Sequence, residues 1–245
     1  MTRYKLTIEY DGTPFSGWQR QEDVPTIQEI LEDAFCDFLK SPVTVWGSGR
    51  TDAGVHAKGQ VAHVDILKSY DTFAIQGAIN KRLQEYPISL LKVEKVASDF
   101  HARFSATQRF YEYKILNRRA PTSLEKKRVW WVVAPLCVKA MNEAAALLLG
   151  QYDFSSFRDS RCQSKSPLKT LDGLTIEKKG EIILVKANAR SFLHHQIRII
   201  VGTLKRIGEG AWAPEKIIQI LEAKDRKAAG PTAPAHGLYL TEIKF

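Results

Sequence analysis

The sequence predicts an α+β fold with a mixed, mainly antiparallel sheet. Its 245 residues are 44% hydrophobic, which is enough for a substantial core. Segments that alternate apolar and polar residues are interspersed with segments of helical period. The order of these elements in the first half recurs loosely in the second, which predicts two halves at 1–105 and 106–245.

The first half reads as strand, helix, two strands, helix and strand. The segment 3–10 alternates, with apolar residues at every second position from Tyr4 to Tyr10, as a half-buried strand does. The segment 27–39 has an apolar stripe of helical period, and Thr26 with Glu29 forms a predicted capping box at its start. The same criteria predict strands over 43–47, 59–66 and 88–96, and a second helix over about 72–84.

The second half repeats that order less regularly. Strands are expected over 109–116, 128–133, 171–178, 181–188 and 238–245, with helices over 138–149 and 192–207 and another from Pro214. Gly150 is expected to end the helix over 138–149. Together the halves suggest two split βαβ units, ferredoxin-like or RRM-like, packed around the sheet with a central cleft.

Composition points to a polyanionic partner. The formal charge is +9 and the isoelectric point about 9.4, and nucleic acid is the commonest partner of such a chain. The cations gather in two connections, at Arg118, Arg119, Lys126, Lys127 and Arg128, and at Arg158, Arg161, Lys165 and Lys169. These connections are either solvated loops or segments that grip phosphates.

The cysteines and the apolar runs predict a cytoplasmic protein without a membrane partner. Cys36, Cys137 and Cys162 are odd in number and far apart, so they predict neither a disulfide framework nor a CxxC metal site. No apolar run approaches the roughly 18 residues of a membrane span. The first residues lack the apolar core of a secretory signal.

The segment 47–56 has the residues for chemistry. It holds three glycines, which predict a tight loop after a strand, and it places Arg50 two residues before Asp52. A nearby cation favours the ionised form of a carboxylate, which can then act as a nucleophile, a general base or a metal ligand. The alternative is a glycine-rich turn whose Asp52 caps a neighbouring backbone. The phosphate-loop pattern GxxxxGK[ST] is absent.

The segment Gly49-Arg50-Thr51-Asp52-Ala53-Gly54-Val55-His56 resembles the signature of the tRNA pseudouridine synthase A family. Further blocks resemble that family in the same order along nearly the whole chain, at 10–19, 100–106, 111–113, 153–157, 192–198, 230–234 and 237–240. The segment 83–87 departs from the family, which more often has Leu-Pro directly, and this puts only the local loop geometry in doubt.

The resemblance implies an enzyme that converts uridine to pseudouridine at positions 38–40 of the tRNA anticodon stem-loop. It implies a homodimer that needs no metal ion and no organic cofactor. Asp52 is then the catalytic nucleophile and Arg50 the residue that keeps it ionised. Tyr111 is the residue that stacks on the flipped base, and its hydroxyl is a candidate to assist removal of the C5 proton.

Four further residues are expected to bind substrate. The resemblance favours Arg198, on the predicted helix 192–207, as a partner of Asp52 or of a phosphate, and it matches Leu240 to a hydrophobic site position. Trp18 is a candidate for an RNA-contacting loop and Arg158 for a phosphate grip. Each has a structural alternative: a solvated face for Arg198, a core position for Leu240 and Trp18, and a solvated loop for Arg158. Tyr111 can likewise be an ordinary strand residue.

Two other functions stay open from the residues alone. One is a metal-dependent RNA hydrolase that uses Asp52, His56 and His63, which lie close in sequence. The other is a non-catalytic RNA-binding module, since split βαβ sheets are common RNA platforms. The first would lose its activity with a chelator, and the second would bind RNA without turnover.

Overall fold

The computed structural model describes all residues, Met1–Phe245, and divides them into two compact units. The first unit holds Met1–Thr107 together with Tyr239–Phe245, and the second holds Gln108–Leu238. The chain therefore returns to its first unit at the end, whereas the sequence-based division assigned 239–245 to the second half.

The first unit is built on the strands β1 (Thr2–Tyr10), β3 (His56–Ile66), β4 (Ile88–Val96) and β11 (Leu238–Lys244), in the order β4-β1-β3-β11. β1 pairs antiparallel with both β3 and β4, and the short β2 (Trp46–Gly47) pairs antiparallel with β3. β11 pairs parallel with β3, where Tyr239 lies opposite His56 and Leu240 opposite Ala57. The first half thus has the predicted order of strands and helices.

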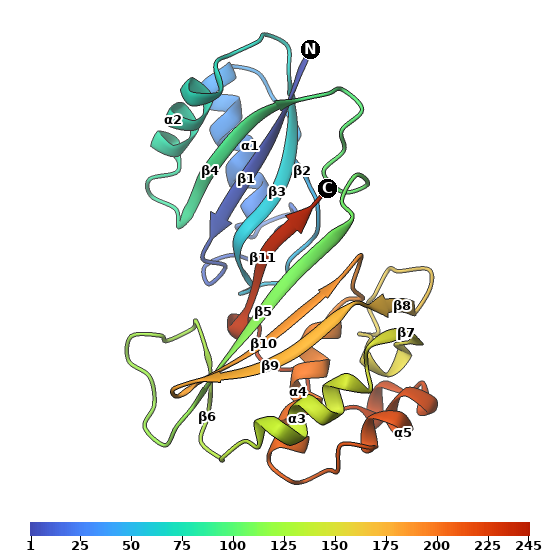
Figure 1. The fold of residues 1–245 in the computed structure, drawn as a ribbon. Helices are drawn as coiled ribbons and strands as arrows, with labels where there is room; N and C mark the ends of the chain where they lie inside the picture. The colour runs from blue at the N-terminus through green and yellow to red at the C-terminus, as the bar shows by residue number, and fades with distance from the viewer. The chain divides into compact units, whose positions relative to one another are not determined.

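The core of the first unit lies between its sheet and the helices α1 (Ile27–Leu39) and α2 (Thr72–Arg82), which lie on one side of the strands (Figure 1). The alternation predicted for the first strand is confirmed, because Tyr4, Leu6, Ile8 and Tyr10 are all buried. Ile27, Leu31, Phe35, Ile75 and Ile79 of the two helices are buried as well. Burial of these apolar side chains supplies most of the stabilisation of such a unit.

The predicted bounds of α1 are confirmed, but its predicted capping box is wrong. Thr26 is the N-cap residue, yet its side chain makes no capping hydrogen bond, and Oγ1 is buried without a partner. The backbone carbonyls of Gly17 and Trp18 accept from the N–H groups of Ile27 (3.2 Å) and Gln28 (3.0 Å) instead. A loop from elsewhere in the chain therefore satisfies donors at the helix start that a capping side chain would otherwise serve.

The second unit contains a sheet in the order β5-β10-β9, formed by β5 (Gln108–Asn117), β10 (Ile182–Ala189) and β9 (Gly173–Lys179). These strands pair antiparallel, and the short β6 (Trp130–Val132) adds to β5 in parallel. A separate ribbon, unpredicted from the sequence, pairs β7 (Gly150–Asp153) with β8 (Leu168–Leu171).

Three helices belong to the second unit: α3 (Val138–Ala146), α4 (Gln196–Gly208) and α5 (Lys216–Ala223). The side chain of Asn142 fastens α3 to the edge of the sheet by a bond to the Ile176 carbonyl oxygen (2.8 Å) and another from the Ile176 N–H (3.0 Å). Short 3₁₀ turns lie at Ser155–Phe157, Arg226–Ala228 and Ala235–Gly237.

Two predicted helix ends of the second unit are wrong. α3 ends at Ala146, and Gly150, the predicted C-terminal glycine, begins β7 with a φ of +106°. α4 begins at Gln196 rather than at residue 192, because His195 adopts a left-handed conformation with a φ of 62°. His194, which falls within the predicted helix, therefore precedes α4.

The predicted fold class is confirmed: the structure is α+β, and its sheets are mixed and mainly antiparallel. No helix is both long enough and apolar enough to span a membrane.

Candidate active site

The loop that carries Asp52 is held by its neighbours on both sides. The carbonyl oxygen of Thr51 accepts from the N–H of Trp18 (3.0 Å), and the buried Thr51 hydroxyl bonds to the Tyr10 hydroxyl (2.8 Å). The Val55 N–H donates to the carbonyl oxygen of Asp52 itself (3.1 Å). Asp52 is only partly buried, and the backbone of its loop is held by these hydrogen bonds.

A glycine allows the first loop of the chain to approach the Asp52 loop. A Cβ built on Gly12 would lie 2.0 Å from the carbonyl oxygen of Val55, so any other residue would push the two segments apart. The N–H of Gly12 donates to Nδ1 of His56 (3.1 Å). The signature 49–56 and the segment 10–19 are therefore one packed structure within the first unit.

Arg50 and Trp18 take different positions around this loop. Arg50 is exposed, and its Nε donates to Oε1 of Gln19 (3.1 Å). Trp18 is only 2% exposed, and its ring lies 6.2 Å from the ring of Tyr10. Trp18 therefore lies in the core, which was its structural alternative. Arg50 instead lies at the protein surface.

The structure does not gather Asp52, His56 and His63 into a metal-ligating group. Nδ1 of His56 accepts from the backbone of Gly12, and Nδ1 of His63 accepts from the N–H of Ala102 (3.2 Å). Burial lowers the pKa of His63 to about 4, and the charges of Arg3 and His101 act in the same direction. His63 is thus a neutral hydrogen-bond acceptor of the core.

Tyr111 lies on β5 in the second unit, opposite Ala187 of β10. Its ring is half-buried and meets the ring of Phe192 nearly edge-on, at 5.3 Å and 87°. Edge-to-face packing of this kind is a favoured arrangement of two aromatic rings. Leu240, on β11 of the first unit, is 1% exposed, so it has a core position.

Arg198 lies in the first turn of α4 and contacts the segment 230–234. Its Nε donates to the carbonyl oxygen of Ala233 (2.8 Å), and its own carbonyl oxygen accepts from the N–H of Ala233 (3.0 Å). Arg198 is half-buried, so it does not lie on a solvated face, which was its structural alternative.

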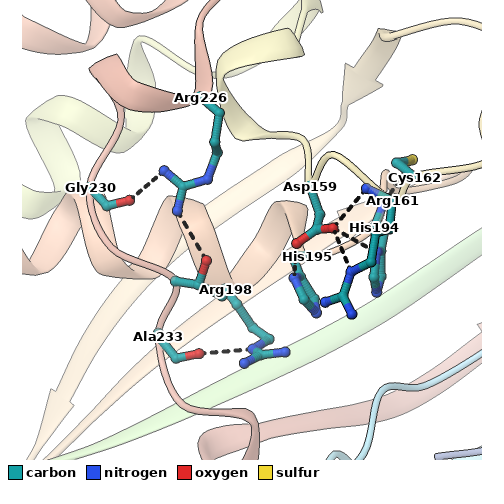
Figure 2. Close-up of polar contacts among 10 residues, drawn as sticks. Asp159, Arg161, Cys162, His194, His195, Arg198, Arg226, Gly230 and Ala233 are labelled. Atoms are coloured by element: carbon teal, nitrogen blue, oxygen red, sulfur yellow. Dashed lines mark hydrogen bonds and ion pairs between the residues drawn. The ribbon is translucent and has the colours of Figure 1, made fainter.

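The basic connection around residue 160 is tied to the start of α4 through Asp159 (Figure 2). The Asp159 carboxylate accepts from Nδ1 of His195 (2.8 Å) and from the N–H of Arg161 (2.9 Å). Burial acts to raise the pKa of Asp159, but the hydrogen bonds from the Arg161 backbone and the His195 ring outweigh it and lower this pKa to about 2. One Nη of Arg158 donates to the carbonyl oxygens of Cys162 (2.9 Å) and Ser164 (2.7 Å). Arg158 therefore binds the backbone of its own loop. The sequence predicted that it would bind a phosphate.

Two residues of this region, Asp159 and Arg226, were not predicted from the sequence. Asp159 joins the connection to His195, and Arg226 donates to the carbonyl oxygen of Gly230 (2.9 Å) and to the Thr232 hydroxyl (3.0 Å). Both lie next to recognisable blocks, at 153–157 and 230–234, but a single charge in a loop has no pattern of its own. Their roles depend on contacts between segments that are distant in sequence.

Comparison with known proteins places these residues in a family. A family model described as tRNA pseudouridine synthase matches residues 6–105 and 144–245. The chain is 55% identical over 245 residues to tRNA pseudouridine synthase A of Rhodospirillum centenum, covering 100% of both chains. It is 53% identical to the protein of that name from Paramagnetospirillum magneticum, over 100% of this chain and 96% of the relative. It is 52% identical to that of Bartonella tribocorum, over 100% of both.

Proposed function

Because the chain belongs to the tRNA pseudouridine synthase family, whose enzymes isomerise uridine in tRNA, we propose that it acts at positions 38–40 of the anticodon stem-loop with Asp52 as its nucleophile. The observation that carries this proposal is the Asp52 loop. Its backbone is fixed by Trp18, Thr51 and Val55, and Asp52 itself is only partly buried.

The reaction needs a group that acts at the sugar. The bond from uracil N1 to ribose C1′ breaks, the base turns, and C5 forms the new bond to C1′. The proton on C5 is lost and N1 gains one, so the product is an isomer of the substrate. The Asp52 carboxylate can attack C1′ and hold the sugar covalently until C5 displaces it, or it can remove a sugar proton as the base departs and return it when C5 bonds to C1′. Both routes need an ionised carboxylate at a fixed position, and neither changes the oxidation state of the substrate.

Tyr111 is proposed to hold the extruded uracil. A base that lies within a stem-loop must leave its stack to be turned, and an aromatic platform compensates by roughly 1–3 kcal/mol per base. The edge-on contact with Phe192 supports this role, because it packs the tyrosine ring against a second aromatic side chain. The Tyr111 hydroxyl is proposed to assist removal of the C5 proton.

Cations of both units are proposed to bind the RNA backbone. Arg50 is exposed next to the Asp52 loop, and Arg198 offers a planar guanidinium that suits a phosphate or a carboxylate. Lys165 is exposed on the connection that Arg158 shapes. Phosphate contacts of this kind supply affinity and orientation rather than choice of sequence.

Mapping of pseudouridine in unmodified tRNA transcripts incubated with the purified protein tests the proposal. New pseudouridine is expected at positions 38, 39 or 40, and a transcript with cytidine at all three is expected to gain none. Dialysis against a chelator, with the tRNA fold controlled for, is expected to leave the yield unchanged.

Pseudouridine elsewhere in the tRNA would keep the family activity but contradict the proposed position. Binding of the transcript with no pseudouridine at all would instead favour the non-catalytic RNA-binding module.

We also propose that the enzyme works as a homodimer, which rests on its resemblance to the family. Light scattering at micromolar concentration is expected to give a mass near twice the 27.7 kDa of one chain. A mass of one chain at that concentration would contradict this proposal.

A further inference from the structure

The segment 230–234 lies with its backbone directly on α4. A Cβ built on Gly202 would lie 1.7 Å from the Pro231 carbonyl oxygen, which shows how closely the two backbones approach. The N–H of Gly230 donates to the buried Thr203 hydroxyl (2.9 Å), which itself donates to the Ile199 carbonyl oxygen (2.8 Å). The segment therefore has a fixed position on α4, beside the turn that follows Arg198.

Two hydrogen bonds between Arg198 and Ala233 extend the contact of the segment 230–234 with α4 to the first turn of the helix. Ala233 donates its N–H to the Arg198 carbonyl oxygen and accepts from the Arg198 Nε, at 3.0 and 2.8 Å. A guanidinium is planar, so a bond to Nε sets the plane in which both Nη groups lie. The position of one carbonyl oxygen therefore orients the whole charged end of Arg198.

Arg226 also bonds to this segment (Figure 2). Its Nη1 donates to the Gly230 carbonyl oxygen (2.9 Å) and its Nη2 to the Thr232 hydroxyl (3.0 Å), so one rigid fork fixes two points of the turn before Ala233. Burial lowers the pKa of Arg226, and the charge of Asp159 acts in the opposite direction. A cation that is partly desolvated to reach two neutral acceptors makes strong, directional bonds, which suits a structural clamp.

We propose that Arg226 is a positioning residue for pseudouridine formation: it fixes the segment 230–232, so that the Ala233 carbonyl oxygen orients the Arg198 guanidinium. This inference rests on the proposed role of Arg198 in the site. Arg226 acts through Arg198 and does not itself touch the substrate.

A double-mutant cycle in the full-length protein tests this link. Single-turnover rates with saturating enzyme and a tRNA transcript, and separate affinities, are measured for Arg226→Met, Arg198→Ala and the double variant. We expect Arg226→Met to slow the chemical step about tenfold to a hundredfold, the effect of a small misplacement of a reacting group. In the Arg198→Ala background, the same change is expected to cost almost nothing more.

Three further variants sharpen the test. Lys227→Met removes an exposed cation from the same 3₁₀ turn and is expected to leave the rate unchanged. Thr232→Val removes the hydroxyl that accepts from Arg226 but keeps the shape of the side chain. It is expected to slow the chemical step several-fold, again only when Arg198 is present. Arg226→Lys keeps the charge without the fork and is expected to restore little of the lost rate.

The outcomes separate the two proposals. If Arg198→Ala slows the reaction and the effects of the two changes multiply in the double variant, Arg226 does not act through Arg198 and the positioning role is overturned. If Arg198→Ala leaves the rate unchanged, the proposed role of Arg198 in the site fails and the positioning role falls with it. Should Arg226→Met not fold, the cycle of Thr232→Val with Arg198→Ala decides in the same way.

Discussion

Replacing Asp52 by Asn is expected to lower the single-turnover rate of pseudouridine formation by several orders of magnitude, roughly 10³-fold or more. The side chain keeps its shape and loses its charge, so it can neither attack C1′ nor remove a sugar proton efficiently. Affinity for tRNA is expected to stay near that of the wild type, because it rests mainly on contacts between cations and phosphates.

Thermal stability is expected to change little, because backbone bonds and the Thr51 hydroxyl hold this loop. Asp33→Asn is the matched control, since it removes the same charge from an exposed position of α1 and should leave the rate unchanged. A near-native single-turnover rate in an Asp52→Asn protein that melts normally would remove Asp52 as the nucleophile. A protein that no longer folds would show that the carboxylate holds the loop.

The local pattern of apolar and polar residues predicted helices and strands well where burial of one face alone decides their position. The alternation in β1 and the apolar stripe of α1 follow from which face each element buries, so their bounds could be found from residue types. The ends of helices were harder, because distant partners decide them. Ile27 and Gln28 donate to the carbonyls of Gly17 and Trp18, so the start of α1 does not need the Thr26 side chain. No pattern near 26–29 contains that information.

The start of α4 shows a second limit of prediction from sequence. Phe192 and Leu193 fit the apolar stripe of the helix, but His195 is left-handed and the helix begins after it. The bond from His195 to Asp159 helps to hold that turn, and the two residues lie 36 positions apart in the sequence. The ribbon of β7 and β8 is likewise a pairing of short segments across a loop, with little alternation in either strand.

The candidate site depended on the resemblance more than on pattern. From residue types alone, Asp52 could be a nucleophile, a general base or a metal ligand, and Tyr111 an ordinary strand residue. The structure gives His56 and His63 backbone partners and does not gather them with Asp52. It also places Trp18 in the core and shows that Arg158 binds backbone carbonyl oxygens of its own loop.

Gly202→Ala is expected to destabilise the second unit by about 2 kcal/mol or more, although alanine is the better helix former. Inside a helix, alanine gains about 1 kcal/mol over glycine. Here its Cβ would lie 1.7 Å from the carbonyl oxygen of Pro231, which is backbone and cannot rotate away. The segment 230–234 must then move off α4, which strains the packing by about 1–3 kcal/mol and leaves buried partners such as the Gly230 N–H unsatisfied at a similar cost.

Gly77→Ala in α2 is the matched control, because a Cβ at Gly77 meets nothing within 4 Å and only the helical gain remains. We expect urea unfolding to show Gly77→Ala slightly more stable than the wild type and Gly202→Ala clearly less stable. Gly202→Ala should also slow the chemical step under conditions where it stays folded, because the Ala233 carbonyl oxygen no longer reaches the Arg198 Nε. If both variants are stabilised alike, the segment 230–234 yields at no cost, and it cannot be the rigid element that orients Arg198.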